Sequence, residues 1–353
     1  MTLADAPFPD SDGLRHSTLK TSGLPARILS VLRDGGLAVL EDLCGPIPPC
    51  ERLDADDRAL LTRVVTYAHT VCDGNPPTLS LPEWMELFLP SRLVDTLQLH
   101  YGLQDSAAAL SRHEARLRET GFKLGVSRER ARQLIGLATG TLQQALPLYA
   151  AEPLYRAAEK ILHEDGGVAT PKSLAARHGP SWGELSPVGA FLLLTHLVPG
   201  RLTLYRGFFS ECAPKLIERA ENSLRDQLTA QAGLTPIAQI ADNLPRSACP
   251  PGIPDAGPLL LALLRHLPDM LATRDDRCGL AARDGSVLLR EILATTGETP
   301  LRILVEAFNE RLYPECRRGS GYIRNALGLD PQIHKSAPGR YDLPGGLQTD
   351  LPL

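Results

Sequence analysis

Polar and charged side chains crowd a short segment around a glycine that can turn the backbone. In order along the chain they are Lys123, Ser127, Arg128, Glu129, Arg130, Arg132 and Gln133. Ammonium, guanidinium and amide groups donate hydrogen bonds to phosphate oxygens and to the edges of bases, and a carboxylate accepts them. The segment is therefore suited to binding an anionic surface that also presents hydrogen-bond donors and acceptors.

Two short helices joined by a tight turn would position these side chains. Gly125 supplies the backbone freedom that such a turn needs, and Ser127 is a favourable N-cap for the second helix. The charged residues then occupy the first two turns, where a recognition helix presents side chains to the major groove. We expect Leu134, Leu137 and Ala138 on the opposite face.

The segments Leu89–Leu103 and Leu124–Gln133 resemble the fourth conserved region of bacterial sigma-70-type factors. In that family a helix-turn-helix reads the promoter −35 element, and the resemblance spans residues 89–146. It implies that Arg128, Glu129, Arg132 and Gln133 face base edges, and that Ser127 and Arg130 face the DNA backbone. The alternative is a motif that serves only as a packing or protein-docking module.

A local surface, and not the whole chain, must provide the positive charge for such binding. The formal net charge is −4 over 353 residues. Residues 109–145 nevertheless carry seven basic and three acidic side chains, a local excess of +4. With 43% hydrophobic residues, the chain is long enough to form two or more packed domains.

Residues 22–74 are expected to form a small helical domain. A helical pattern begins at Leu24, a Gly-Gly turn follows at 35–36, and a second short helix comes next. This part resembles the C-terminal domain of the RNA polymerase alpha subunit, in which the position of Arg27 contacts the minor groove. Three acids within residues 53–58 would repel phosphate, so DNA binding and protein docking both stay open.

An internal repeat occupies the second half of the chain. Thr-Pro pairs begin at Thr170, Thr235 and Thr299, with spacings of 65 and 64 residues. Each threonine is expected to cap a helix, between a preceding and a following helix, and each copy closes on a proline and a strand pattern. We predict three tandem winged-helix-like units with small β-hairpins, at 153–210, 214–283 and 285–346. A continuous helical array without hairpins is the alternative.

The third copy differs from the others in its polar side chains. The third helices of the first two copies are too apolar to lie against phosphates, and they should pack or bind protein. The third copy instead has a basic helix and a basic hairpin, which suit phosphates and base edges unless they form only a solvated face. Its candidate DNA-binding residues are Arg317, Arg318, Tyr322, Arg324, Asn325, Lys335 and Arg340.

The sequence contains no recognisable catalytic, cofactor or metal site. It has neither a phosphate loop nor a Gly-x-Ser-x-Gly motif, and its seven cysteines are never spaced as Cys-x-x-Cys. No apolar run approaches the roughly 20 residues that span a bilayer. We therefore expect a cytoplasmic protein with reduced thiols that is not an enzyme and needs no cofactor, no metal and no membrane.

The combined expectation is a mostly α-helical, multi-domain protein. Residues 1–21 should be a disordered tail, and the helix-turn-helix domain should span 78–148 between the alpha-like domain and the repeats. The expected function is transcription regulation by binding double-stranded DNA, with RNA polymerase or other proteins open as partners. The alternative is a protein-interaction scaffold of helix-turn-helix modules with little DNA binding.

Overall fold

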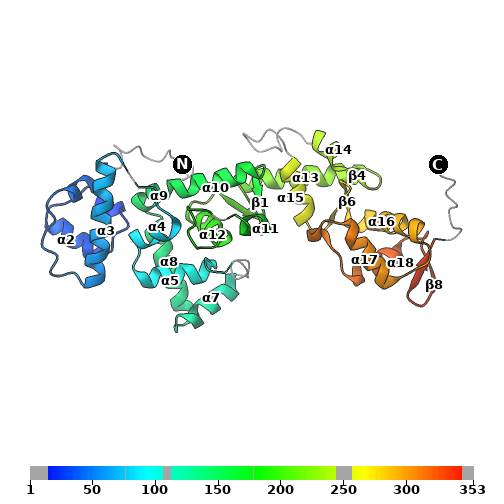
Figure 1. Cartoon of the computed structure of the whole chain (residues 1–353), viewed down its shortest axis with the longest axis horizontal. Helices are drawn as coiled ribbons and strands as arrows, with labels where there is room; N and C mark the ends of the chain where they lie inside the picture. The colour runs from blue at the N-terminus through cyan, green and yellow to red at the C-terminus, as the bar shows by residue number, and fades with distance from the viewer. Residues whose placement is uncertain (1–14, 76, 106–112, 178, 244–256, 344–353) are drawn as a thin grey trace. The chain divides into compact units, whose positions relative to one another are not determined.

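A computed structural model describes residues 15–75, 77–105, 113–177, 179–243 and 257–343, and the chain divides into two compact units. The first unit comprises residues up to 164 with 169–204 and 209–211, and the second comprises 165–168, 205–208 and 212–353. Helices dominate, as expected, and three small three-stranded sheets accompany them (Figure 1).

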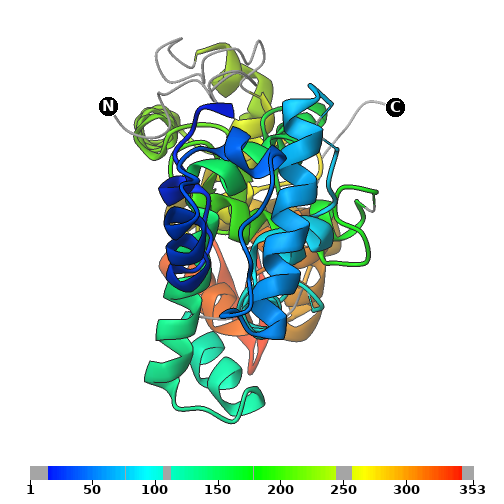
Figure 2. The same cartoon turned by 90° about the vertical axis from the view of Figure 1, so that its left-hand side faces the viewer.

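The N-terminal part of the first unit begins earlier than the sequence indicated. Leu19 is only 4% exposed, and its N–H donates to the carbonyl of Ala38 over 2.8 Å. The expected tail to residue 21 is therefore too long, because the leucine side chain can enter the core; residues 1–14 lie outside the described part. The elements here, coloured blue in Figure 2, are η1 (Leu19–Thr21), α2 (Ala26–Asp34), η2 (Leu40–Cys44) and α3 (Ala55–Cys72).

A cluster of helices follows within the same unit. Trp84 is fully buried, and its indole N–H donates to the carbonyl of Pro147 over 2.8 Å, which ties the start of the cluster to its end. A Cβ at Gly189 would lie 2.7 Å from the carbonyl oxygen of Tyr101, so glycine permits close packing there. The helices are α4 (Leu81–Phe88), α5 (Ser91–Tyr101), α7 (His113–Lys123), α8 (Arg128–Leu142) and α9 (Ala145–Ala150).

The remaining chain repeats one order of elements three times: helix, short strand, helix, helix and hairpin. The first copy has α10 (Glu152–Glu164), β1 (Val168–Ala169), α11 (Pro171–Ala175), α12 (Pro187–Leu197), β2 (Thr203–Tyr205) and β3 (Phe208–Ser210). The second has α13 (Pro214–Ala230), β4 (Thr235–Pro236), α14 (Ile237–Asp242), α15 (Gly257–His266), β5 (Met270–Ala272) and β6 (Arg277–Leu280). The third has α16 (Ala281–Thr296), β7 (Thr299–Pro300), α17 (Leu301–Arg311), η4 (Pro314–Cys316), α18 (Ser320–Leu329), β8 (His334–Ala337) and β9 (Arg340–Asp342).

The three sheets share one strand order. They run β1-β3-β2, β4-β6-β5 and β7-β9-β8, so the second strand of each hairpin is always central. In the last two sheets the pairing is antiparallel throughout. Hairpins therefore follow the third helix of each copy, where prolines and strand patterns predicted them, and the alternative of a helical array without hairpins is wrong.

Only one of the three repeated threonines caps a helix. The Thr170 hydroxyl accepts from the Ser173 N–H over 3.1 Å at the start of α11. Thr235 and Thr299 instead belong to short strands, and their hydroxyls donate to nearby carbonyls at residues 233 and 297. The prediction of three caps was wrong for these two because pairing with the hairpin holds them extended and the following proline takes the N-cap position.

The second and third copies share one sheet edge and one core. The Tyr313 N–H donates to the carbonyl of Ala272 over 3.1 Å, and the Arg274 N–H donates to that of Arg311 over 2.8 Å. The outer edge of β5 is thereby covered by residues 311–313. The guanidinium of Arg265 also lies 3.9 Å above the Tyr313 ring. These two copies consequently form a continuous body within the second unit.

The cap at Thr170 generates a local prediction. Replacing Thr170 with Ala should cost about 1 kcal/mol of α11 stability, because the Ser173 N–H loses its acceptor. Thr170→Ser keeps the hydroxyl and should behave as the parent. Amide hydrogen exchange at Ser173 measures the difference, and equal protection in the two variants would rule out the cap.

Candidate nucleic-acid interface

The turn between α7 and α8 depends on two glycines. Gly125 has a φ of +64°, in the left-handed region that favours glycine. Gly121 accepts from the Val126 N–H over 2.9 Å, and a Cβ on it would lie 3.0 Å from the Val126 carbonyl oxygen. The sequence interpretation found Gly125 but missed Gly121, since a close approach between two helix ends has no spacing signal of its own.

Ser127 starts α8 as the sequence predicted. Its hydroxyl accepts from the Arg130 N–H over 3.1 Å, and its backbone is extended, as an N-cap requires. The capped first turn presents Arg128 and Glu129 to solvent, and both are exposed. The cap fixes where α8 begins, and this determines on which side of the helix each following side chain lies.

The two faces of α8 differ sharply in exposure. Leu134 and Ala138 are buried in the core of the first unit, whereas Arg132 and Gln133 are exposed. Leu137 is 59% exposed, so its expected place on the buried face was wrong. The buried positions 131, 134, 135, 138, 139 and 142 follow the helical period, and residue 137 falls outside that stripe.

Intrahelical contacts hold the exposed polar side chains of α8. The Arg132 guanidinium donates to both carboxylate oxygens of Glu129, over 2.9 and 2.6 Å. These bonds lower the pKa of Glu129 and raise that of Arg132. The Arg130 guanidinium donates to the amide oxygen of Gln133 over 3.1 Å. Exposed pairs of this kind are weak, so the groups can exchange these contacts for others at small cost.

The end of α7 adds a cation and an exposed aromatic ring next to the turn. The Lys123 ammonium lies 2.8 Å from a Glu119 carboxylate oxygen, and both side chains are about half exposed. Phe122 is 87% exposed, which is unusual for a large apolar side chain. Arg118 is exposed on the same helix, while burial lowers the pKa of Arg116.

A second polar surface of the third copy comprises Arg317 before α18, α18 itself and the β8–β9 hairpin. Five of the predicted residues are exposed there: Arg317, Arg324, Asn325, Lys335 and Arg340. The Arg340 guanidinium lies 3.8 Å from Glu298, a long and exposed ion pair. The structure therefore leaves these five side chains accessible.

Arg318 and Tyr322 instead make internal contacts within the second unit. The Arg318 guanidinium donates to the carbonyls of Pro268 and Met270, over 3.0 and 2.6 Å. The Tyr322 hydroxyl donates to the carbonyl of Ala281 over 2.5 Å, and burial raises the Tyr322 pKa to about 12. The Arg318 contacts join the third copy to the second, and the Tyr322 contact joins α18 to the start of α16. Neither could be seen in the sequence, because the partners are backbone carbonyls some 40 to 50 residues away.

Arg27, on α2, is paired with two acidic side chains. Its guanidinium lies 3.0 Å from Asp54 and 3.1 Å from Asp57. Burial raises the pKa of Asp57, and the positive charge of Arg27 opposes that rise. The arginine that the resemblance would place in a minor groove thus pairs with acids at the start of helix α3.

The contact between α16 and α18 yields a stability prediction. A methyl group at Gly285 would overlap the Tyr322 hydroxyl, so Gly285→Ala should destabilise the second unit by about 1–3 kcal/mol. Tyr322→Phe alone should cost about 1 kcal/mol through its lost hydrogen bond. The double variant should lose less than the sum, because the missing hydroxyl makes room for the methyl group. Urea unfolding tests this, and strictly additive losses would contradict it.

The described ranges contain no candidate metal site and no candidate membrane span. No group of three or more His, Cys, Asp or Glu side chains in them could hold a metal ion, and none of their helices is long and apolar enough to cross a membrane. Cys44, Cys50, Cys72, Cys278 and Cys316 form no disulfide, and Cys249 lies outside the described part. Comparisons of the chain with protein-family models, curated proteins and solved structures gave no match.

Proposed function

We propose that the chain is a transcription regulator that binds double-stranded DNA through α8. The observation that carries this proposal is the exposed polar row Arg128, Glu129, Arg132 and Gln133 on the first two turns of a capped helix whose other face is buried. A major groove about 12 Å wide admits such a helix. The row combines donors and an acceptor, and such a combination suits base edges better than a uniform anionic surface.

The side-chain types also match known base chemistry. Arginine pairs with the two acceptors of guanine, glutamine pairs with adenine, and glutamate accepts from the amino group of cytosine. Arg132, Gln133 and Glu129 could therefore each specify a base, while Lys123 and Arg130 contact phosphates and set the position of the helix. The Arg132–Glu129 pair would open on binding, and its exposure makes that step inexpensive.

We further propose that the three copies are winged-helix-like modules, of which the third contacts DNA. The common strand order and the common position of the hairpin support this assignment. α12 and α15 are largely buried, which suits a supporting role. The exposed side chains of α18 and the last hairpin supply a second cationic surface, from which Arg318 and Tyr322 are omitted because of their internal contacts.

The scaffold alternative has its own supporting observation. Phe122 and Leu137 are exposed at 87% and 59% next to the polar row, and large apolar side chains at such places favour contact with protein. Under this alternative the α7–α8 region would dock RNA polymerase or another protein. Both functions predict a partner at the same surface but differ in which side chains matter.

The test uses the full chain and a random pool of duplex DNA from which bound sequences are selected. Arg132→Ala should weaken binding to the selected site by about 1–3 kcal/mol and flatten preference at one base pair. Gln133→Ala should do the same at a neighbouring base pair. Arg130→Ala should weaken binding to all sequences alike and reduce the slope of log K against log salt by about 1.

Arg156→Ala is the matched control, since Arg156 is an exposed arginine in an intrahelical pair on α10. It should bind as the parent does. If the three α8 variants also bind selected and scrambled DNA like the parent, while Phe122→Ala loses capture of RNA polymerase, the scaffold function replaces the DNA-binding function.

A further inference from the structure

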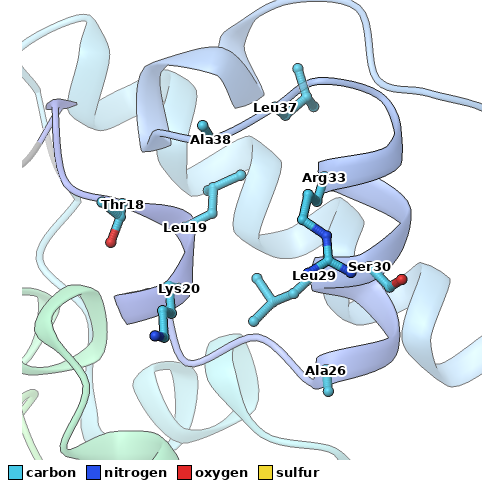
Figure 3. A pocket seen from close by; sticks show the side chains of 9 residues that line it. All are labelled: Thr18, Leu19, Lys20, Ala26, Leu29, Ser30, Arg33, Leu37 and Ala38. Carbon is cyan, nitrogen blue, oxygen red and sulfur yellow. The ribbon is translucent and has the colours of Figure 1, made fainter.

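An open hollow lies between η1 and α2 in the alpha-like domain. Its volume is about 510 Å³, within the range of ligand-binding pockets. Figure 3 shows Leu19 and Leu29 extending into the space between the two elements, with Leu37 at one end. Ala26 and Ala38 complete an apolar floor, so a large apolar side chain would be removed from water there.

Two cations border this floor from opposite sides. Lys20 belongs to η1 and Arg33 to the last turn of α2; both are exposed, and no acidic side chain lines the hollow. Within the described ranges neither cation forms an ion pair. The hollow thus offers an apolar floor with positive charge on both walls.

Three acids of the same region contact groups outside the hollow's charged rim. Asp54 and Asp57 contact Arg27. Asp42 accepts from the N–H groups of Ala38 and Val39 over 2.7 and 2.9 Å, which lowers its pKa. None of these three carboxylates lines the hollow, whose charged lining residues are Lys20 and Arg33 alone.

We propose that this hollow binds an acidic peptide that inserts a large apolar side chain between η1 and α2 while its carboxylates pair with Lys20 and Arg33. Charge complementarity selects an acidic partner, and the apolar floor selects a peptide over a nucleic acid, whose phosphates gain nothing from leucine side chains. The inference does not depend on DNA binding by α8, because the two surfaces share no residue.

The probe is a fluorescein-labelled nine-residue peptide in which aspartates alternate with leucine and phenylalanine, and its control replaces every aspartate with lysine. Fluorescence anisotropy with the full chain should show binding of the acidic probe only. Lys20→Glu with Arg33→Glu should weaken it at least tenfold. Arg58→Glu makes the same kind of change at an exposed residue of α3 away from the hollow, and should alter binding less than twofold.

Two further variants separate charge from shape. Lys20→Gln with Arg33→Gln should weaken binding several-fold and reduce its salt dependence, since the rim cations are removed without adding repulsion. Ala26→Trp keeps both charges and fills the hollow from an exposed position, so it should weaken binding at least fivefold. All these positions are exposed, and circular dichroism verifies that each variant stays folded.

Several results would overturn the proposal. Equal losses in Arg58→Glu and in the double variant would reduce the effect to general charge. Displacement of the probe by duplex DNA in the parent and in Arg58→Glu alike would indicate a nucleic acid as the occupant. A dimer that the double variant dissociates would identify a second copy as the occupant, and tighter probe binding by a chain starting at Arg15 would identify the preceding residues.

Discussion

The close approach of Gly121 to the backbone of Val126 is the constraint on which the candidate interface depends. It brings the end of α7 against the start of α8, and the left-handed Gly125 closes the turn. Ser127 can then cap α8 in one register, and this register places Leu134 in the core and Arg132 in solvent. A side chain at position 121 would separate the helices and rotate the polar row relative to its support.

Much of the secondary structure could be predicted from the sequence, because prolines and apolar patterns often mark the same boundaries that tertiary packing requires. The hairpins after Pro199, Pro268 and Pro331 lie where a proline and a strand pattern close each copy in the sequence. The caps at Thr235 and Thr299 were mispredicted because strand pairing with a distant hairpin overrides a local capping preference. The local sequence pattern identifies where a helix begins, but strand pairing elsewhere in the chain determines whether the residue before it caps the helix.

The candidate site shows the same division. The types and spacing of Arg128, Glu129, Arg132 and Gln133 indicated a polar row, and the structure places these side chains together on the exposed face of α8. Sequence could not separate Arg317, which is exposed, from Arg318, whose guanidinium is taken up by carbonyls of the preceding copy. Adjacent arginines of identical chemistry differ only through backbone partners remote in the chain.

The strand-like contact between residues 311–313 and β5 has a consequence for how many copies the chain can have. An uncovered β5 edge would present free N–H and C=O groups, and such edges pair with other chains and promote aggregation. The third copy therefore also protects the second from pairing with other chains, because residues 311–313 occupy the β5 edge. Deleting the third copy would expose the β5 edge of the second and promote self-association. The copies of this chain therefore cannot be removed singly without changing how the remaining ones behave.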